Sequence, residues 1–226
     1  MVNVLVVAPH ADDETLGVGG TIAKHVDSGD HVTVAVMTGH GEEPHPLWPT
    51  DTWQEVRAEA QQACRVLGAH ELALRDIPAV LVADQPQWQV NSITQALLDD
   101  FQPDILYVPF PYDMHRDHRE IFHSMSVAWR PSTSTGRTIR EVYAYEVPSE
   151  THWNAPYLEP GFTPNTWVDI SHHLSRKLEA LGCYASQIPA WPHARSVAAL
   201  EHLARWRGSQ IGVEAAEGLV LIRKLV

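Results

Sequence analysis

Two kinds of apolar pattern alternate along the first 130 residues. Continuous apolar runs rich in Val, Ile and Leu are typical of strands that are covered on both faces of a sheet. Segments with apolar residues three or four positions apart predict amphipathic helices. The expected strands are Asn3 to Ala8, His31 to Met37, Leu72 to Leu74 and Asp104 to Pro109, and the expected helices are Glu14 to Ser28, Asp51 to Leu67, Val90 to Phe101 and Arg116 to Trp129.

Residues at the ends of these segments refine the prediction. Thr38 to Thr50, with two glycines and three prolines, is expected to be a loop. Asp51 or Thr52 can cap the helix that follows, and Gly68 is placed to end it. The glycines of Gly17 to Gly20 lack the spacing of a phosphate-binding turn and lie inside a helix, so we interpret them as a site of close packing between a helix and a strand.

The pattern changes after Pro131, where loops are longer and strands are shorter. The expected elements are strands at Glu141 to Glu146, Trp167 to Ile170 and Leu219 to Arg223, helices at Leu174 to Ser186 and Val197 to Arg207, and a Pro- and Trp-rich loop at Pro148 to Pro164. We therefore predict an α/β fold: a Rossmann-like, mainly parallel sheet with helices on both faces and C-terminal loop, strand and helix additions. Residues 1–226 are expected to form a single domain, in which 1–130 are the α/β core and 131–226 complete a cleft.

Composition limits the partners and the compartment. Lys and Arg number 16 against 28 Asp and Glu, a net charge of −12, which argues against nucleic acid or an anionic membrane as a partner. No window approaches the ~20 apolar residues that span a bilayer, and the N-terminus resembles a first strand rather than a signal peptide. Cys64 and Cys183 are interpreted as two buried thiols in a reducing compartment. We expect a cytoplasmic protein.

Two polar clusters follow strands that end at the same edge of the predicted sheet. His10 to Glu14 comes after the first strand, and Tyr112 to His118 comes after the strand that ends at Pro109. In parallel α/β sheets, ligands collect beyond the carboxyl ends of the strands. The clusters are therefore expected to face one crevice.

Histidine and acid spacing in these clusters is suited to a metal. His10 and Asp13 are three residues apart, as are His115 and His118, so each pair can point at one centre. Two imidazoles and a carboxylate suit a Zn²⁺ that keeps a position open for water, with a second carboxylate as base and a second histidine for the oxyanion. The alternatives are acids that complement a helix dipole and histidines in a solvated first turn.

The sequence PHADDE with the downstream HRDH resembles the LmbE-like, or PIG-L-type, family of metal-dependent N-acetylglucosaminyl deacetylases. Ala11 stands where that family usually has proline. The resemblance extends to the helix around Arg57 and, in the C-terminal half, to Val168 to Ser171, Lys177, Tyr184 to Gln187, Pro192 to Ser196 and Ala216 to Glu217.

The resemblance implies a division of roles among these residues. One Zn²⁺ per chain would be bound by His10, Asp13 and His118. Asp12 would be the general base. His115 would be the cation that stabilises the oxyanion, and Asp117 would orient it.

The implied reaction is removal of the N-acetyl group from an N-acetylglucosamine-type sugar or glycoconjugate, which gives acetate and a free amine. Arg57 would contact the substrate, the alternative being a surface salt bridge with Glu55 or Glu59. Loops that carry Trp48, Trp53, Trp153 and Trp191 are expected to set substrate choice, and family analogy allows a homotrimer or homohexamer. Two other functions are weighed: a metal- or sugar-binding module without catalysis, and a non-haem iron enzyme that uses the same two histidines and carboxylate.

Overall fold

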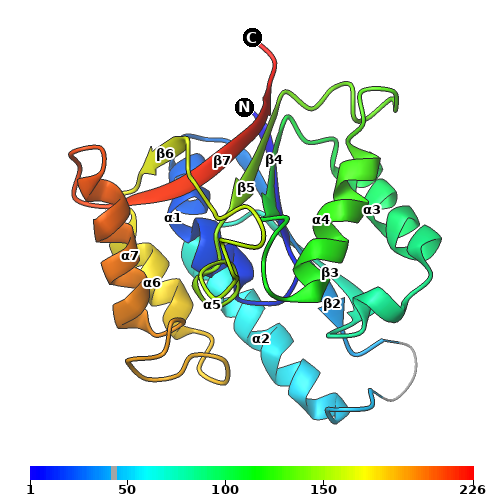
Figure 1. The fold of residues 1–226 in the computed structure, drawn as a ribbon, viewed down its shortest axis with the longest axis horizontal. Helices are drawn as coiled ribbons and strands as arrows, with labels where there is room; N and C mark the ends of the chain where they lie inside the picture. Colours follow the sequence, from blue (N-terminus) through cyan, green and yellow to red (C-terminus); the bar gives the residue numbers. More distant parts are fainter. Residues whose placement is uncertain (42–44) are drawn as a thin grey trace.

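A computed structural model describes residues 1–41 and 45–226, and its core is one seven-stranded sheet (Figure 1). The strands are β1 (Asn3–Ala8), β2 (His31–Gly39), β3 (Glu71–Pro78), β4 (Ile105–Pro109), β5 (Glu141–Tyr145), β6 (Thr166–Asp169) and β7 (Ala216–Lys224). The α-helices are α1 (Asp13–Asp27), α2 (Thr50–Leu67), α3 (Gln87–Phe101), α4 (Arg116–Ala128), α5 (Pro148–Thr151), α6 (Leu174–Gly182) and α7 (Val197–Ser209). The single-domain α/β fold predicted from the sequence is confirmed.

The strand order is β3-β2-β1-β4-β5-β7-β6. Strands β1 to β5 are parallel, and β7 runs antiparallel to both β5 and β6. The chain passes from β1 outward through β2 to β3 and then returns to β4 on the other side of β1. Such a reversal leaves a crevice between the carboxyl ends of the two adjacent strands, here β1 and β4.

Helices cover both faces of the sheet, which explains why the central strands are apolar throughout. Val4 and Val6 of β1 pack in the core under α1, α2, α6 and α7. Leu5 and Val7 point the opposite way, into the core under α3 and α4. Figure 1 shows α3 and α4 on one side of the sheet and α1, α6 and α7 on the other.

Element ends depart from the sequence prediction in several places. Helix α2 begins at Thr50 after Pro49, and no side chain caps it, so the caps predicted at Asp51 or Thr52 are wrong. Gly68 ends this helix with a φ of 83°, as predicted. Elements not expected are the α5 turn and a 3-10 helix at Val82–Asp84, and β3 is longer than predicted because its second half pairs with the end of β2. Glu42, Glu43 and Pro44, within the predicted loop 38–50, lie outside the described residues.

The glycines of α1 bring this helix close to the sheet. A Cβ on Gly17 would lie 2.2 Å from the ring of Tyr145 on β5, and a Cβ on Gly20 would lie 2.7 Å from Ile170. Larger residues would push the helix away from its partners. The packing role predicted for these glycines is confirmed.

The cysteines differ from one another in burial. Both are free, Cys64 is buried, and burial raises the pKa of its thiol. Cys183 is only half-buried, which corrects the expectation of two buried thiols.

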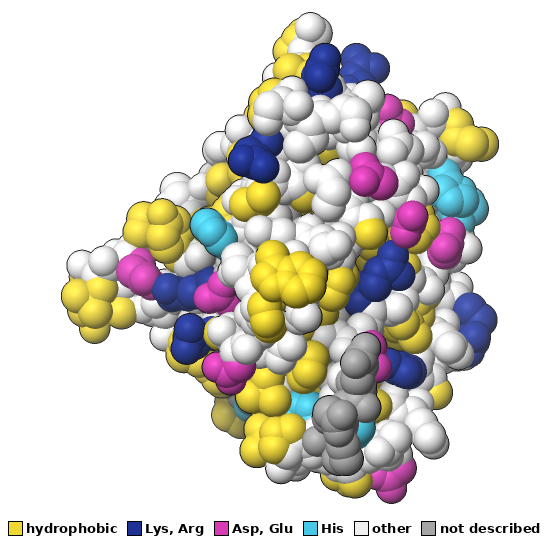
Figure 2. Space-filling view, turned by 90° about the vertical axis from the view of Figure 1, so that its right-hand side faces the viewer, with side chains coloured by type: hydrophobic (Ala, Val, Ile, Leu, Met, Phe, Trp, Pro, Cys, Tyr) yellow, Lys and Arg dark blue, Asp and Glu magenta, His cyan; other side chains and the backbone are white. Residues whose placement is uncertain are grey.

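Within the described residues, no helix is long and apolar enough to cross a membrane. On the face in Figure 2, and outside its grey atoms, basic and acidic side chains are interspersed and no continuous basic patch is visible. A basic stripe for nucleic acid is therefore not found on that face.

Candidate metal centre

Neighbouring strand ends bring the two polar clusters together. His10 follows β1, Asp13 begins α1, and His118 lies in the first turn of α4, which follows β4. Asp13 Oδ2 is 3.4 Å from His10 Nδ1 and 3.2 Å from His118 Nε2. One ligand atom from each of the three side chains lies within 4.8 Å of the others, so this group could hold a metal ion.

His118 shows that the group fits a cation. Its Nε2 atom is buried and has no hydrogen-bond partner, although it faces Asp13. A buried nitrogen without a partner is unfavourable unless something binds it. Two imidazoles and one carboxylate are a donor set that suits Zn²⁺ with a position left open.

Asp113 holds the other nitrogen of His118. Its Oδ2 atom is 2.8 Å from His118 Nδ1, and its Oδ1 atom accepts a hydrogen bond of 2.6 Å from Thr151 Oγ1. Carboxylates behind metal-ligating histidines fix the ring orientation and the tautomer. Asp113 has no role in the sequence prediction, although its position five residues before a predicted ligand histidine is a signal that could have found it.

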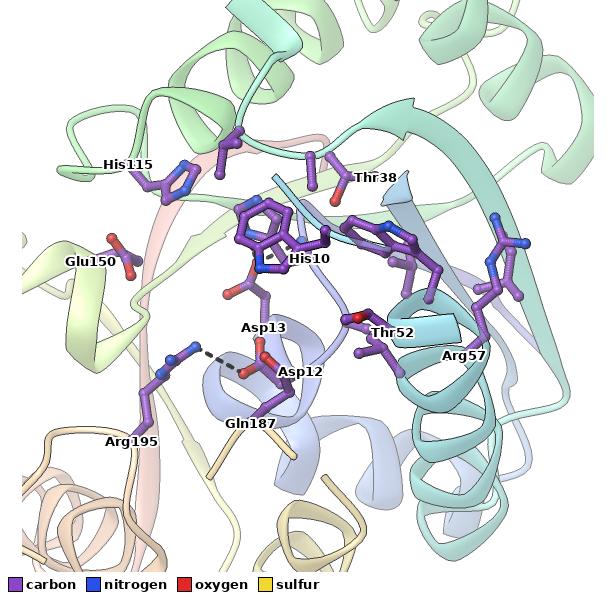
Figure 3. A pocket seen from close by; sticks show the side chains of 18 residues that line it. His10, Asp12, Asp13, Thr38, Thr52, Arg57, His115, Glu150, Gln187 and Arg195 are labelled. Carbon is purple, nitrogen blue, oxygen red and sulfur yellow. Dashed lines mark hydrogen bonds and ion pairs between the residues drawn. The ribbon is translucent and has the colours of Figure 1, made fainter. Parts of the chain in front are cut away.

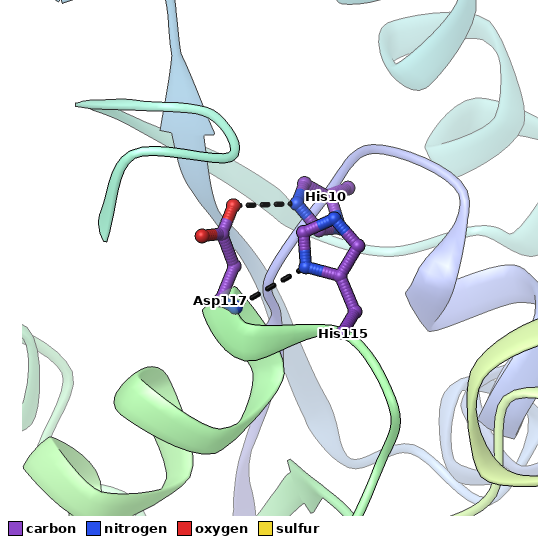
Figure 4. Close-up of side chains that lie close together, drawn as sticks. All are labelled: His10, His115 and Asp117. Carbon is purple, nitrogen blue, oxygen red and sulfur yellow. Dashed lines mark hydrogen bonds and ion pairs between the residues drawn. The ribbon is translucent and has the colours of Figure 1, made fainter. Parts of the chain in front are cut away.

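Asp117 lies where the sequence predicted but contacts a different ring with its carboxylate. Its Oδ2 atom is 2.9 Å from His10 Nε2 and accepts a hydrogen bond from Val80 N (Figure 4). Only its backbone N–H reaches His115, donating to Nδ1 over 3.2 Å. Asp117 therefore orients the candidate ligand His10 with its carboxylate and orients His115 with its backbone.

The pKa of His115 favours a neutral ring in the metal-free chain, and the cationic role that the resemblance implies stays a prediction. Burial, followed by the positive charge of His10, lowers the pKa of His115 to about 4. Its Nδ1 atom accepts the hydrogen bond from Asp117, so the proton of the neutral ring is on Nε2. In the metal-free chain the ring therefore offers an N–H donor at Nε2.

In the metal-free chain, protons on the two histidines balance the negative charge of the neighbouring aspartates. Burial alone would lower the pKa of His10, but hydrogen bonds to Asp117 and Asp13 raise it to about 9. Asp13 and Asp113 likewise raise the pKa of His118 against the effect of burial. For Asp13, burial acts upward, but His118 and His10 outweigh it and hold the pKa well below its usual range.

Metal binding is therefore expected to release protons. At pH 7 the metal-free protein holds a proton on His10, whose pKa is about 9, whereas a histidine that binds a metal must be neutral. Affinity for Zn²⁺ should rise by at least about tenfold per pH unit between pH 6 and 8, because at least one proton is released for each metal ion bound. Titration calorimetry in two buffers of different ionisation enthalpy measures the release. Equal heats in both buffers, with a flat affinity, would contradict this charge assignment.

Asp12 occupies a strained position beside the centre. Its φ of 115° lies in a region that L residues rarely adopt, which costs about 1–3 kcal/mol. Glu14 Oε2 accepts the Asp12 N–H, and Glu14 is itself held by a 2.6 Å hydrogen bond from Tyr184. The Asp12 carboxylate faces Arg195 Nη1 at 3.3 Å. Burial, and then the charge of Asp13, raises the pKa of Asp12 well above its usual range.

A pocket of about 340 Å³ opens over this group. Its lining includes His10, Asp12, Asp13, Trp48, Trp53, Arg57, His115, Glu150, Gln187 and Arg195 (Figure 3). Arg57 pairs with Asp76 at 2.7 Å rather than with Glu55 or Glu59, so the surface salt bridge weighed for it is not formed. Among the four tryptophans of interest, Trp48 and Trp53 line the pocket, whereas Trp153 and Trp191 are exposed elsewhere.

The profile of the family PIG-L, described as GlcNAc-PI de-N-acetylase, matches residues 5–129, which carry both polar clusters. The chain belongs to the PIG-L family. The resemblance expected from PHADDE and HRDH is confirmed.

Individual relatives cover most of the chain. A 1D-myo-inositol 2-acetamido-2-deoxy-alpha-D-glucopyranoside deacetylase from Actinosynnema mirum is 29% identical, over 83% of this chain and 81% of its own length. The structure of the N,N'-diacetylchitobiose deacetylase from Pyrococcus horikoshii, bound to an inhibitor, superposes with a TM-score of 0.73 at 26% identity, over 97% of this chain and 83% of that one. The 4-carboxy-2-hydroxymuconate hydratase GalB from Pseudomonas putida has a TM-score of 0.78 at 22% identity, over 100% and 98% of the two chains. Because a hydratase has this fold too, the reaction must be argued from the site.

Proposed function

We propose that this PIG-L family member is a Zn²⁺-dependent hydrolase that removes the N-acetyl group from an N-acetylglucosamine-type sugar or conjugate. The observation that carries the proposal is the group of His10, Asp13 and His118 with the strained Asp12 beside it in one pocket. A module that only bound metal would have no need of Asp12 or His115. The relatives from Actinosynnema and Pyrococcus are both named as deacetylases, which supports the same reaction for this chain.

The protein's own residues have separable tasks in this reaction. His10, Asp13 and His118 would hold the metal. Bound there, it would act as a Lewis acid that polarises a carbonyl group and lowers the pKa of a water molecule. Asp12, whose raised pKa makes it a competent proton acceptor, takes the proton of the attacking water and holds it for the leaving nitrogen. The Nε2–H of His115 donates a hydrogen bond to the oxyanion as the acetamide carbon becomes tetrahedral.

Arg57 and two tryptophans are proposed to bind the sugar. Arg57 lies across the pocket from His115, and its pairing with Asp76 fixes the guanidinium at the pocket wall. Trp48 and Trp53 pack against each other with ring centroids 6.0 Å apart and contribute aromatic faces to the same wall. Such faces pack well on the apolar face of a pyranose ring.

An acetate-release assay tests the proposal. Purified protein loaded with Zn²⁺ is expected to produce acetate and primary amine in equal amounts from N-acetylglucosamine, N,N'-diacetylchitobiose or an N-acetylglucosaminyl inositol. Chelation should stop the reaction, and added Zn²⁺ should restore it. Metal analysis that finds iron, with oxygen consumption and no acetate, would replace this proposal with the oxygenase alternative, and bound metal without turnover of any sugar would leave only a binding module.

A further inference from the structure

Unpartnered polar atoms gather at the pocket. Six buried side-chain nitrogen or oxygen atoms in the described residues have no hydrogen-bond partner. Three of them belong to pocket-lining residues, namely Trp53 Nε1, Glu150 Oε2 and Arg195 Nε, and a fourth is His118 Nε2 at the metal group. Since the large majority of buried polar atoms in proteins are paired, this grouping indicates atoms arranged for a ligand.

Glu150 and Arg195 lie on the same side of the pocket, opposite Arg57. In Figure 3, Glu150 is placed between His115 above and Arg195 below. Both residues come from the C-terminal portion of the chain, Glu150 from α5 and Arg195 from the segment before α7. This wall is therefore separate from the one that Arg57 and the tryptophans form.

Other contacts hold each residue in place, and in each one buried polar atom has no partner. Glu150 is anchored by its backbone carbonyl, which accepts from Met114 N at 3.0 Å, and by Oε1, which accepts from Ser149 Oγ at 3.0 Å. Arg195 is anchored through Nη1 on Asp12. The buried atoms without a partner are one acceptor, Glu150 Oε2, and one donor, Arg195 Nε–H.

We propose that Glu150 and Arg195 form a subsite for an uncharged hydroxyl group of the substrate, on the side of the pocket opposite Arg57. The Nε–H of Arg195 donates to the hydroxyl oxygen, and the hydroxyl proton is donated to Glu150 Oε2. This inference rests on the proposed function, because it concerns how the same pocket selects its sugar.

The chemistry of the two free atoms selects the ligand class. A hydroxyl is the group that donates and accepts at one atom, whereas phosphate and carboxylate mainly accept and ammonium only donates. An anionic substituent on this wall would also face the carboxylates of Glu150 and Asp12. The subsite therefore takes a polyol or a second sugar and disfavours a phosphorylated or carboxylated group.

Kinetics of two Glu150 variants test the subsite. Glu150→Ala is expected to raise KM for N,N'-diacetylchitobiose by about 10- to 100-fold, the usual worth of a hydrogen bond to a charged group, with kcat within about threefold. Glu150→Gln keeps an acceptor oxygen, so KM should return to within about threefold of the original, while the selectivity against N-acetylglucosamine phosphates relaxes. Glu179→Ala, an exposed glutamate on α6, is the matched control and should change neither value.

The outcomes separate this inference from the proposed function. Unchanged KM in a folded Glu150→Ala protein, or a loss of kcat alone, overturns the subsite even when acetate release is normal. If the Zn²⁺-loaded protein releases no acetate from any sugar, the proposed function fails, and calorimetric binding of methyl β-glucoside then decides the subsite. Weaker binding by Glu150→Ala than by Glu179→Ala supports it, and equal binding by the two variants overturns it.

Discussion

Replacing Asp12 with asparagine is expected to lower kcat by about 10²–10⁴-fold, the usual contribution of a general base. Asparagine has nearly the same shape and tolerates a positive φ, so the φ of 115° at this position is kept. It cannot accept the proton of the attacking water. Acetate release under saturating substrate, with metal content measured on the same sample, gives the comparison.

Metal content makes the Asp12 test specific. The candidate ligands His10, Asp13 and His118 are untouched, so the variant is expected to bind the one Zn²⁺ that is proposed for the original protein. Asp84→Asn, at an exposed aspartate in the 3-10 helix, is a control that should leave kcat unchanged. Near-normal turnover by Asp12→Asn would assign the base to another group, and loss of the metal together with activity would make Asp12 a ligand instead.

The second large effect is expected on stability, from Lys177→Met. Lys177 is 2% exposed, and its Nζ contacts Glu217 Oε1 at 2.5 Å and the carbonyl of Leu16 at 2.9 Å. Removing the lysine leaves a carboxylate buried without its counter-charge, which costs about 3–5 kcal/mol of unfolding free energy. Urea unfolding followed by circular dichroism measures this change.

The neighbouring residue provides a matched control for Lys177. Arg176 on the same helix pairs with Asp27, but both side chains are about one-third or more exposed, so Arg176→Met should cost less than about 1 kcal/mol. Adding Glu217→Gln to Lys177→Met should recover part of the loss, since the amide still accepts a hydrogen bond from Gly20 or Thr21 without a buried charge. Equal losses from Lys177→Met and Arg176→Met would contradict a structural role for the buried pair.

This pair also links the C-terminal portion to the metal centre. Glu217 on β7 accepts hydrogen bonds from Gly20 N and Thr21 N, and Lys177 on α6 binds the Leu16 carbonyl one turn earlier. These contacts lie on either side of Val18, where helix α1 is kinked. The helix that begins with Asp13 is thus fixed from behind by two elements that are far away in sequence.

Local patterns in the sequence determined most of the fold and the identity of the candidate ligands. Apolar runs located β1 correctly at Asn3–Ala8, because a strand covered on both faces must be apolar at every position. The three-residue spacings and the positions after β1 and β4 indicated that both polar clusters face one crevice, because strand ends and helical turns are local features. The family resemblance then selected His10, Asp13 and His118 as the ligands. The caps predicted at Asp51 or Thr52 were wrong, because α2 begins earlier, at Thr50 directly after Pro49.

Only the tertiary structure determined which side chains contact the candidate ligand His10 and the neighbouring Asp12. The Asp117 carboxylate contacts His10 across 107 residues, and Arg195 contacts Asp12 across 183. These partners depend on strand order and on how the C-terminal helices pack, which residue spacing does not encode. The physical reason is that hydrophobic periodicity shows only which face of one helix or strand is buried. A hydrogen bond between distant elements depends instead on how far apart the packed sheet holds them.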